Sequence, residues 1–382
     1  MKNSYFLSQP HQPFFVLAFV NAIIFMLLFM LSYKGILPLS VDIINFHAFG
    51  LIYLFFTPAY YAFLFTTFPK FLSTPVVLKS LYIKIFFLYI LATIFFIVGA
   101  LFSQNLYTAG MILTTIAFIY SYKILFSIYV KSTVENKEDT FWILVGATFG
   151  VIGIVLFTFT AFSAVATQIS VYLYLFVLAF SVAQRMIPFF SQCKFAKNKN
   201  FLTFIVILLV LHVIIESIYT NFSFIVDFIL AVYIAKELKR WELPFPNKNA
   251  LLWILHIALF WVPIAFLLSA ISNAMEFFYD KSFLALDIHT LMLGFLLTVL
   301  FGFGTRVTLG HSGNKMVINK LTTFIFYGTQ VVVLVRVLVS IFSSLGMNFM
   351  IIFDISITCL LLLFLVWIWQ FLKVLTHGKK LN

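Results

Sequence analysis

The stretch from Ser282 to Gly313 reads SFLALDIHTLMLGFLLTVLFGFGTRVTLGHSG, and it decides the fold of this chain. It opens with an acid and a histidine two residues apart, Asp287 and His289. An apolar run without a charge follows as far as Arg306, and a polar tail with His311 closes the stretch. A run of this length predicts a helix that spans a lipid bilayer. Ionisable residues at its entrance and exit indicate ligand chemistry near both membrane faces, because spanning alone does not require them.

The composition places the whole chain in a membrane. Of its 382 residues, 63% are hydrophobic and 9% are charged, and Phe occurs 52 times. A soluble domain of this size could not keep so much apolar surface from water, so the lipid bilayer is the expected partner. The net charge of +12 would suggest nucleic acid in a soluble protein. Here it comes from basic loops, and no nucleic-acid partner is expected.

The cysteines and the N-terminus exclude other classes. Cys193 and Cys359 lie in different segments and form no CxxC pattern, so they predict neither a disulfide framework nor a zinc site. The first apolar run, residues 14–31, is too long for a cleavable signal and no small-residue cleavage motif follows it.

Hydropathy predicts an all-α integral membrane protein, a bundle of about 12 transmembrane helices. The connections are too short to hold a soluble domain, so residues 1–382 are expected to form a single polytopic membrane domain. The predicted spans are 13–32, 43–68, 80–102, 107–130, 141–166, 168–190, 201–220, 222–239, 249–273, 282–306, 318–342 and 347–375.

Lysine and arginine predict the orientation. They concentrate in or beside the connections that follow even-numbered spans, whereas the opposite connections hold only Lys34 and Lys281. Because cytoplasmic loops collect basic residues, both termini are expected to be cytoplasmic. The concentrated set comprises Lys70, Lys79, Lys84, Lys131, Lys137, Lys194, Lys197, Lys199, Lys236, Lys239, Arg240, Lys248, Lys315, Lys320, Lys379 and Lys380.

Arg336 and Asp354 are charges inside predicted spans. Each lies six or seven residues from the outer end of its span, which is about 10 Å deep at about 1.5 Å per residue. Either charge alone would be costly there, so we predict an ion pair between them. The pair would clamp the last two helices, which we favour, or form part of a proton or anion path. The other outer acids either form an acidic vestibule or are simply tolerated on that side.

Histidines supply the candidate ligands. His47 and His289 enter inward-running spans at a shared depth, where facing helices of membrane haem proteins place axial histidines. A lone His in a helix is more often a hydrogen-bonded core residue, so both interpretations stay open. His11 and His311 lie at the predicted cytoplasmic surface and could meet there as a second site.

Four stretches resemble the NnrS family, polytopic membrane proteins described as containing haem and copper and linked to the nitric oxide response. PHQPFF at Pro10–Phe15 is similar to the family's entrance to the first helix. FHA at Phe46–Ala48 resembles the start of a His-Ala-His-Glu motif, and RMIPFF at Arg185–Phe190 resembles the end of the sixth helix. TRVTLGHSG at Thr305–Gly313 resembles the exit of the tenth helix and is the most specific of the four.

The resemblance implies haem, and possible copper, as cofactors, with His47 and His289 as haem ligands. His11 and His311 are the candidate metal ligands of the second site. Arg185 and Arg306 would pair with haem propionates or with anionic lipid. One departure matters, since the second His and the Glu of the family motif are Phe49 and Gly50 here. It weakens the case for copper more than the case for haem.

The expected function is that of a haem-binding protein of the bacterial inner membrane that helps the cell tolerate nitric oxide, which would itself be a ligand. Too few histidines lie in the spans for a haem–copper reductase, which argues against autonomous catalysis. One alternative is a metal-free transporter or export protein for a small solute. Another is an assembly factor for a respiratory complex.

Overall fold

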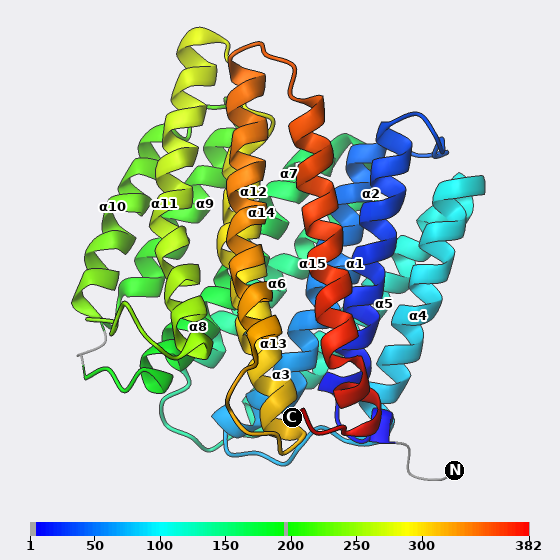
Figure 1. The fold of residues 1–382 in the computed structure, drawn as a ribbon, viewed down its shortest axis with the longest axis vertical. Helices are drawn as coiled ribbons and strands as arrows, with labels where there is room; N and C mark the ends of the chain where they lie inside the picture. Colours follow the sequence, from blue (N-terminus) through cyan, green and yellow to red (C-terminus); the bar gives the residue numbers. More distant parts are fainter. Residues whose placement is uncertain (1–4, 195–197, 382) are drawn as a thin grey trace. The chain divides into compact units, whose positions relative to one another are not determined.

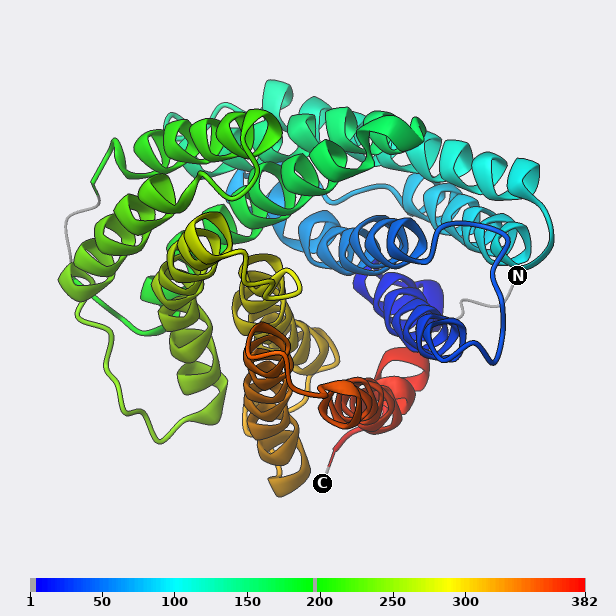
Figure 2. The same ribbon diagram turned by 90° about the horizontal axis from the view of Figure 1, so that it is seen from above.

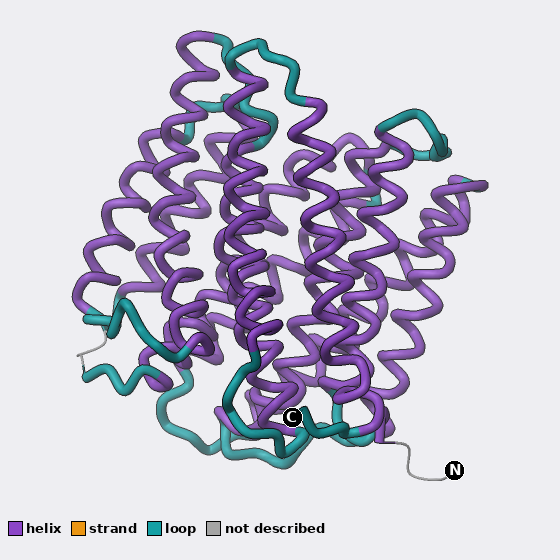
Figure 3. Tube along the Cα trace, in the orientation of Figure 1, coloured by secondary structure: helices purple, strands orange, loops and turns teal. Residues whose placement is uncertain are grey.

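The computed structural model describes residues 5–194 and 198–381, and Lys197, one of the basic residues named above, lies outside them. The described part consists of helices joined by loops and contains no strand (Figure 3). Three of its helices are interrupted, and with each of these counted once the described residues form twelve long helices. Eleven of them are long and apolar enough to cross a membrane. The predicted fold class, a multi-pass helical membrane protein, is confirmed.

Figure 1 labels these helices; the short turn η1 (Tyr5–Leu7) precedes α1, and the short turn η3 (Thr160–Phe162) lies between α6 and α7. Their bounds are α1 His11–Tyr33; α2 Ile43–Phe49, η2 Gly50–Phe56 and α3 Thr57–Phe71; α4 Lys79–Phe102; α5 Gln104–Lys131; α6 Glu138–Phe157; α7 Ser163–Gln168, η4 Ile169–Phe176 and α8 Val177–Phe190; α9 Phe201–Ile218; α10 Phe224–Arg240; α11 Ala250–Tyr279; α12 Leu286–His289, η5 Thr290–Leu297 and α13 Thr298–His311; α14 Lys320–Ser344; and α15 Met350–His377.

The predicted boundary that differs most from the structure is the break between the fifth and sixth spans. The break between the fifth and sixth spans was placed at residue 167, whereas α6 ends at Phe157 and the next helical segment begins at Thr160. Hydropathy cannot locate this break, because the residues around it are apolar or small and carry no charge, Gly or Pro. The helix ends where the backbone of Phe159 becomes extended, with φ −110° and ψ 106°.

Three helices contain a π-helical segment, and these segments recur at a constant spacing. η2, η4 and η5 begin at residues 50, 169 and 290, which are 119 and 121 residues apart. The next two helices of each set recur at similar intervals, between 119 and 126 residues. They begin at residues 79, 201 and 320 and at residues 104, 224 and 350. The chain is therefore built from three successive four-helix repeats. π-Helical turns are rare and are frequent at functional sites.

Local chemistry explains the first π-helical segment. Pro58 has no N–H, so the carbonyl of Leu54, four residues earlier, loses its helical donor. The buried Asn21 of α1 replaces that donor, with Nδ2 2.7 Å from the Leu54 oxygen. Thr57 closes the segment by donating its hydroxyl to the carbonyl of Ile52 at 2.8 Å. Thr298 does the same after η5, at 3.1 Å from the carbonyl oxygen of Leu293.

By its internal contacts the chain divides into two compact units. The first contains the residues up to Leu178, Gly304–Met316 and the chain from Phe364 onward. Its core includes Phe19 stacked on Trp367, with ring centroids 3.9 Å apart. Gly378 lies against the ring of Tyr5, so the two ends of the described chain meet within this unit.

In the first unit α4 and α5 form a close antiparallel pair, and α1 lies beside α3 (Figure 2). The second unit contains Ala179–Phe303 and Val317–Leu363. There α11 packs on α10, η5 and α12, and α14 packs on η5. The single polytopic domain expected from the short connections stays a prediction.

Candidate functional site

His47 lies in the second turn of α2, three residues before η2 begins. The helix starts there because the carboxylate of Asp42 accepts the backbone N–H of Asn45 at 2.8 Å, as an N-cap residue does. Asp42 therefore has a structural role. The imidazole of His47 is half-buried and lies against Phe29, with ring centroids 4.2 Å apart.

His289 ends α12 and immediately precedes η5. Its Nδ1 lies 2.7 Å from the carbonyl oxygen of Ala285 and 3.1 Å from a guanidinium nitrogen of Arg336. A carbonyl only accepts and a guanidinium only donates, so the two contacts require different tautomers of the ring. In the tautomer that donates to Ala285, Nε2 carries no proton, and backbone carbonyls orient metal-binding histidines in this form.

Arg336 is buried to 9% exposure and is held by several acceptors. Its guanidinium donates to the hydroxyl of Ser340 at 2.6 Å and to the carbonyl of Leu284, beside its contact with His289. The ion pair with Asp354 stays a prediction. The contact between Arg336 and a candidate ligand was not foreseen. One signal was present in the sequence: α12–α13 and α14 follow one another in the chain, so they can pack as a hairpin. That packing brings Arg336 to His289.

His11 and His311 come together in the first unit. His11 begins α1 and His311 ends α13, and their ring centroids lie 5.0 Å apart with planes inclined by 45°. His11 is 2% exposed, and its Nδ1 has no hydrogen-bond partner among the described residues. A buried ring nitrogen without a partner is costly, so this position suits a ligand.

The C-terminal segment holds the loop that follows His311. Lys380 donates to the carbonyl of Ser312 at 2.5 Å, and the side chain of Asn314 accepts the backbone N–H of Leu381 at 2.7 Å. Asn314 also donates to the carbonyl of Lys379 at 3.3 Å. The histidine pair is therefore fixed by three separate segments of one unit.

Other predicted site residues are placed individually. Arg185 lies on α8 in the second unit and Arg306 on α13 in the first, both half-buried. His47 likewise belongs to the first unit and His289 to the second.

Within residues 5–194 and 198–381, no group of three or more His, Cys, Asp or Glu side chains could hold a metal ion. A haem, which takes only one or two protein ligands, is compatible with this ligand supply.

A buried acid–imidazole cluster in the second unit was missed by the sequence analysis. Asp227 of α10 lies 2.6 Å from Nδ1 of His212 of α9, and both side chains are fully buried. The other carboxylate oxygen accepts from Ser223 at 3.0 Å, Ser269 at 2.8 Å and Asn273 at 3.0 Å. The only signal in the sequence was that His212 and Asp227 are ionisable residues in apolar segments. The three donors show no pattern in the sequence, because Ser269 and Asn273 reach Asp227 only when α11 packs on α10.

A second polar cluster joins η2 to η4 in the first unit. The hydroxyl of Tyr53 lies 2.6 Å from that of Ser170, and the hydroxyl of Thr57 lies 2.8 Å from that of Tyr174. All four side chains are fully buried. These bonds tie two π-helical segments together inside an otherwise apolar core.

A family model described as NnrS protein matches residues 5–379, nearly the whole chain. The match spans all four motif stretches and both candidate histidine pairs. No curated protein matches the chain.

Proposed function

The chain belongs to the NnrS family, and on that premise we propose that it binds haem within the membrane and contributes to tolerance of nitric oxide and nitrosative stress. The bacterial inner membrane is its proposed location. The observation that best supports haem is the place of His47 and His289 beside π-helical segments, which are frequent at functional sites. His289 directly precedes η5, and His47 lies three residues before η2.

His47 and His289 are the proposed haem ligands. When bound, the haem iron supplies a coordination position at which nitric oxide can bind. Arg336 adds a positive charge beside His289. The Phe-rich surroundings of α2, where Phe46 and Phe49 are fully buried, keep water from this region and admit an apolar gas.

Copper is the second proposed cofactor, at His11 and His311. Imidazole nitrogen suits copper, and the unpartnered Nδ1 of the buried His11 supports a ligand there. Arg185 and Arg306 are proposed to pair with haem propionates or with anionic lipid.

Metal-free transport of a small solute is the second candidate function. The fully buried His212–Asp227 pair favours it, because ionisable residues inside membrane helices mark ion and substrate paths. Bound haem separates the two proposals.

The test is a reduced-minus-oxidised visible spectrum of the detergent-purified protein, together with His47→Ala, His289→Ala and the exposed His377→Ala as control. We expect a b-type haem signal in the wild type and the control, lost in the first two variants. A wild-type protein without a Soret band, expressed with adequate haem, would overturn the haem proposal and favour transport. Copper content of the same wild type and of His11→Ala tests the second cofactor.

A further inference from the structure

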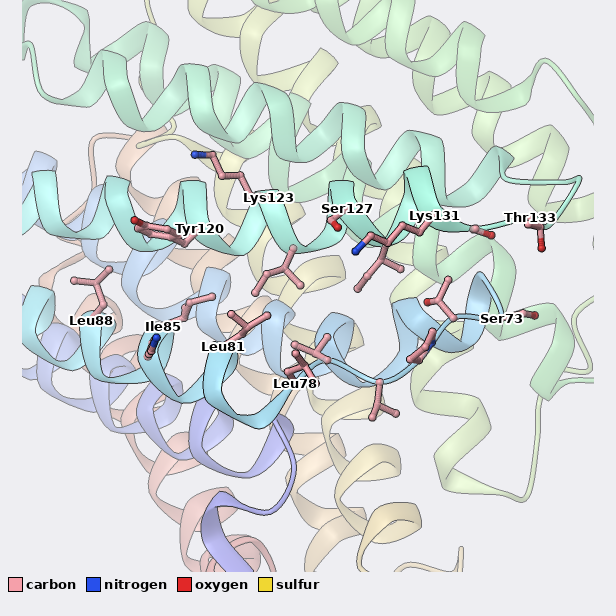
Figure 4. Close-up of a pocket in the computed structure, with 18 residues that line it drawn as sticks. Ser73, Leu78, Leu81, Ile85, Leu88, Tyr120, Lys123, Ser127, Lys131 and Thr133 are labelled. Atoms are coloured by element: carbon pink, nitrogen blue, oxygen red, sulfur yellow. The ribbon is translucent and has the colours of Figure 1, made fainter.

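A cavity of about 790 Å³ lies between α4 and α5 in the first unit (Figure 4). Its walls are one face of each helix, including Leu81, Ile85 and Leu88 on α4 and Ile124 and Ser127 on α5. The residues on each helix recur every three or four positions, so each helix leaves one continuous face uncovered. The volume is within the range of pockets that hold small molecules, about 300–1,000 Å³.

The packing of the two helices explains where the cavity lies. At the α4–α5 turn a methyl group on Gly99 would collide with the backbone of Tyr107, and one on Gly110 with the backbone of Phe96. The backbones therefore touch at that end. The cavity lies at the opposite end, where α4 begins and α5 finishes, and larger side chains face one another there.

The end of the cavity is built from anchored backbone. Ser132, just after α5, donates its hydroxyl to the carbonyl of Leu72 at 2.8 Å and so ties the 72–78 segment to that helix. Lys137 in turn donates to the carbonyl of Ser132 at 2.7 Å and to that of Tyr129 at 3.1 Å. The 72–78 segment thus closes one end of the space with defined contacts.

The cavity is apolar in its walls and positive in charge. Lys84, Lys123 and Lys131 line it, and no acid does. In Figure 4 the amine of Lys131 points into the space between the helices, whereas that of Lys123 points away from it. Lys123 lies instead 5.8 Å from the ring centre of Tyr120. Within the described chain, Lys84 and Lys131 make no ion pair or hydrogen bond through their side chains.

We propose that this cavity binds an anionic phospholipid from the leaflet at the Lys131 end of α5. Lys131 would contact the phosphate, Lys84 would add to the attraction, and an acyl chain would lie along Leu81, Ile85 and Leu88. Leu78 is 65% exposed and Tyr120 is 55% exposed, so the cavity is open sideways to the bilayer. Basic pockets between membrane helices bind anionic head groups in this way. The apolar walls favour a lipid over free phosphate.

The experiment is native mass spectrometry of delipidated protein with added phosphatidylglycerol or phosphatidylcholine. We expect the wild type to retain phosphatidylglycerol preferentially, and each of Lys84→Gln and Lys131→Gln to reduce its affinity about five-fold. The matched control is Lys236→Gln/Lys248→Gln, which removes two exposed lysines elsewhere and should leave retention unchanged. Equal retention of both lipids by the wild type would overturn the proposal, as would equal loss in the control.

A second variant tests the space of the cavity independently of the charge of its lysines. Ser127→Trp fills the space while leaving every lysine in place, and it should abolish retention of phosphatidylglycerol with the melting temperature of the protein maintained. Retention unaffected by this variant would place the lipid elsewhere. Inorganic phosphate at millimolar concentration should not displace the lipid, and full displacement would assign a free-anion site instead.

Discussion

Asp227 is a carboxylate surrounded by donors and shielded from solvent. It accepts from the hydroxyls of Ser223 and Ser269 and from the amide of Asn273, and it pairs with His212. Because these groups come from α9, α10, α11 and the α9–α10 connection, one side chain links three helices of the second unit. An acid in a membrane protein core is tolerated only with such complete pairing.

Removal of Asp227 should therefore destabilise the protein strongly. Asp227→Ala leaves an imidazole and three donors without their acceptor, with an expected loss of about 3–5 kcal/mol. Asp227→Asn keeps one carbonyl acceptor and should lose less. Thermal unfolding in detergent measures both, with the exposed Glu135→Ala as the control. A melting temperature of Asp227→Ala equal to that of the control would contradict this role.

At the scale of elements, the π-helical segments are the unusual feature. η2 and η5 are each followed by a buried threonine that bonds the carbonyl five residues earlier. At the equivalent place after η4 the residue is Val177, so the second repeat lacks this bond. Thr57 also bonds Tyr174, which joins the first and second repeats inside the first unit. The threonine hydroxyl thus stabilises both the segment and its packing.

Thr57→Val should test this, because it keeps the side-chain shape and removes the hydroxyl. It leaves the Ile52 carbonyl and the Tyr174 hydroxyl without that partner, at an expected loss of about 1–3 kcal/mol of unfolding free energy. The matched control is Thr115→Val, whose hydroxyl bonds the carbonyl of Met111 within the regular helix α5. Thermal unfolding should show a smaller loss for the control, and equal losses would argue against a special role for Thr57.

At the scale of the whole molecule, the number of crossings can be inferred from the chain ends. Tyr5 and Gly378 touch within the first unit, so we expect both ends to lie on one side of the membrane. Eleven helices meet the length and hydropathy of a span, and an odd number would separate the ends. α10 is the remaining helix, with 17 residues. At about 1.5 Å per residue it is about 26 Å long, close to the bilayer core of about 30 Å.

Reporter fusions test both the crossing of α10 and the predicted orientation. Alkaline phosphatase inserted after Asn221 should be active, and after Asn247 inactive, because these sites flank α10. Green fluorescent protein fused to the C-terminus should fluoresce, as expected for a cytoplasmic end. Two active or two inactive phosphatase insertions would show that α10 does not cross.

The sequence alone determined the class of protein, the number of helices and most of their bounds. The reason is that the length of an apolar run is a local property, and it must match the thickness of the bilayer core. It also identified the family motifs and the histidines of the candidate sites. It missed the break at residues 158–159, where no charge, Gly or Pro marks the end of the helix.

Only the tertiary structure decided which of these residues meet. His11 and His311 are 300 residues apart in the chain, yet their rings are neighbours because α1 begins and α13 ends at the same side of one unit. The partners of Asp227 and the contact between Arg336 and His289 likewise arise between helices. Side-chain partners depend on how helices pack and rotate, and neither hydropathy nor spacing along one helix contains that information.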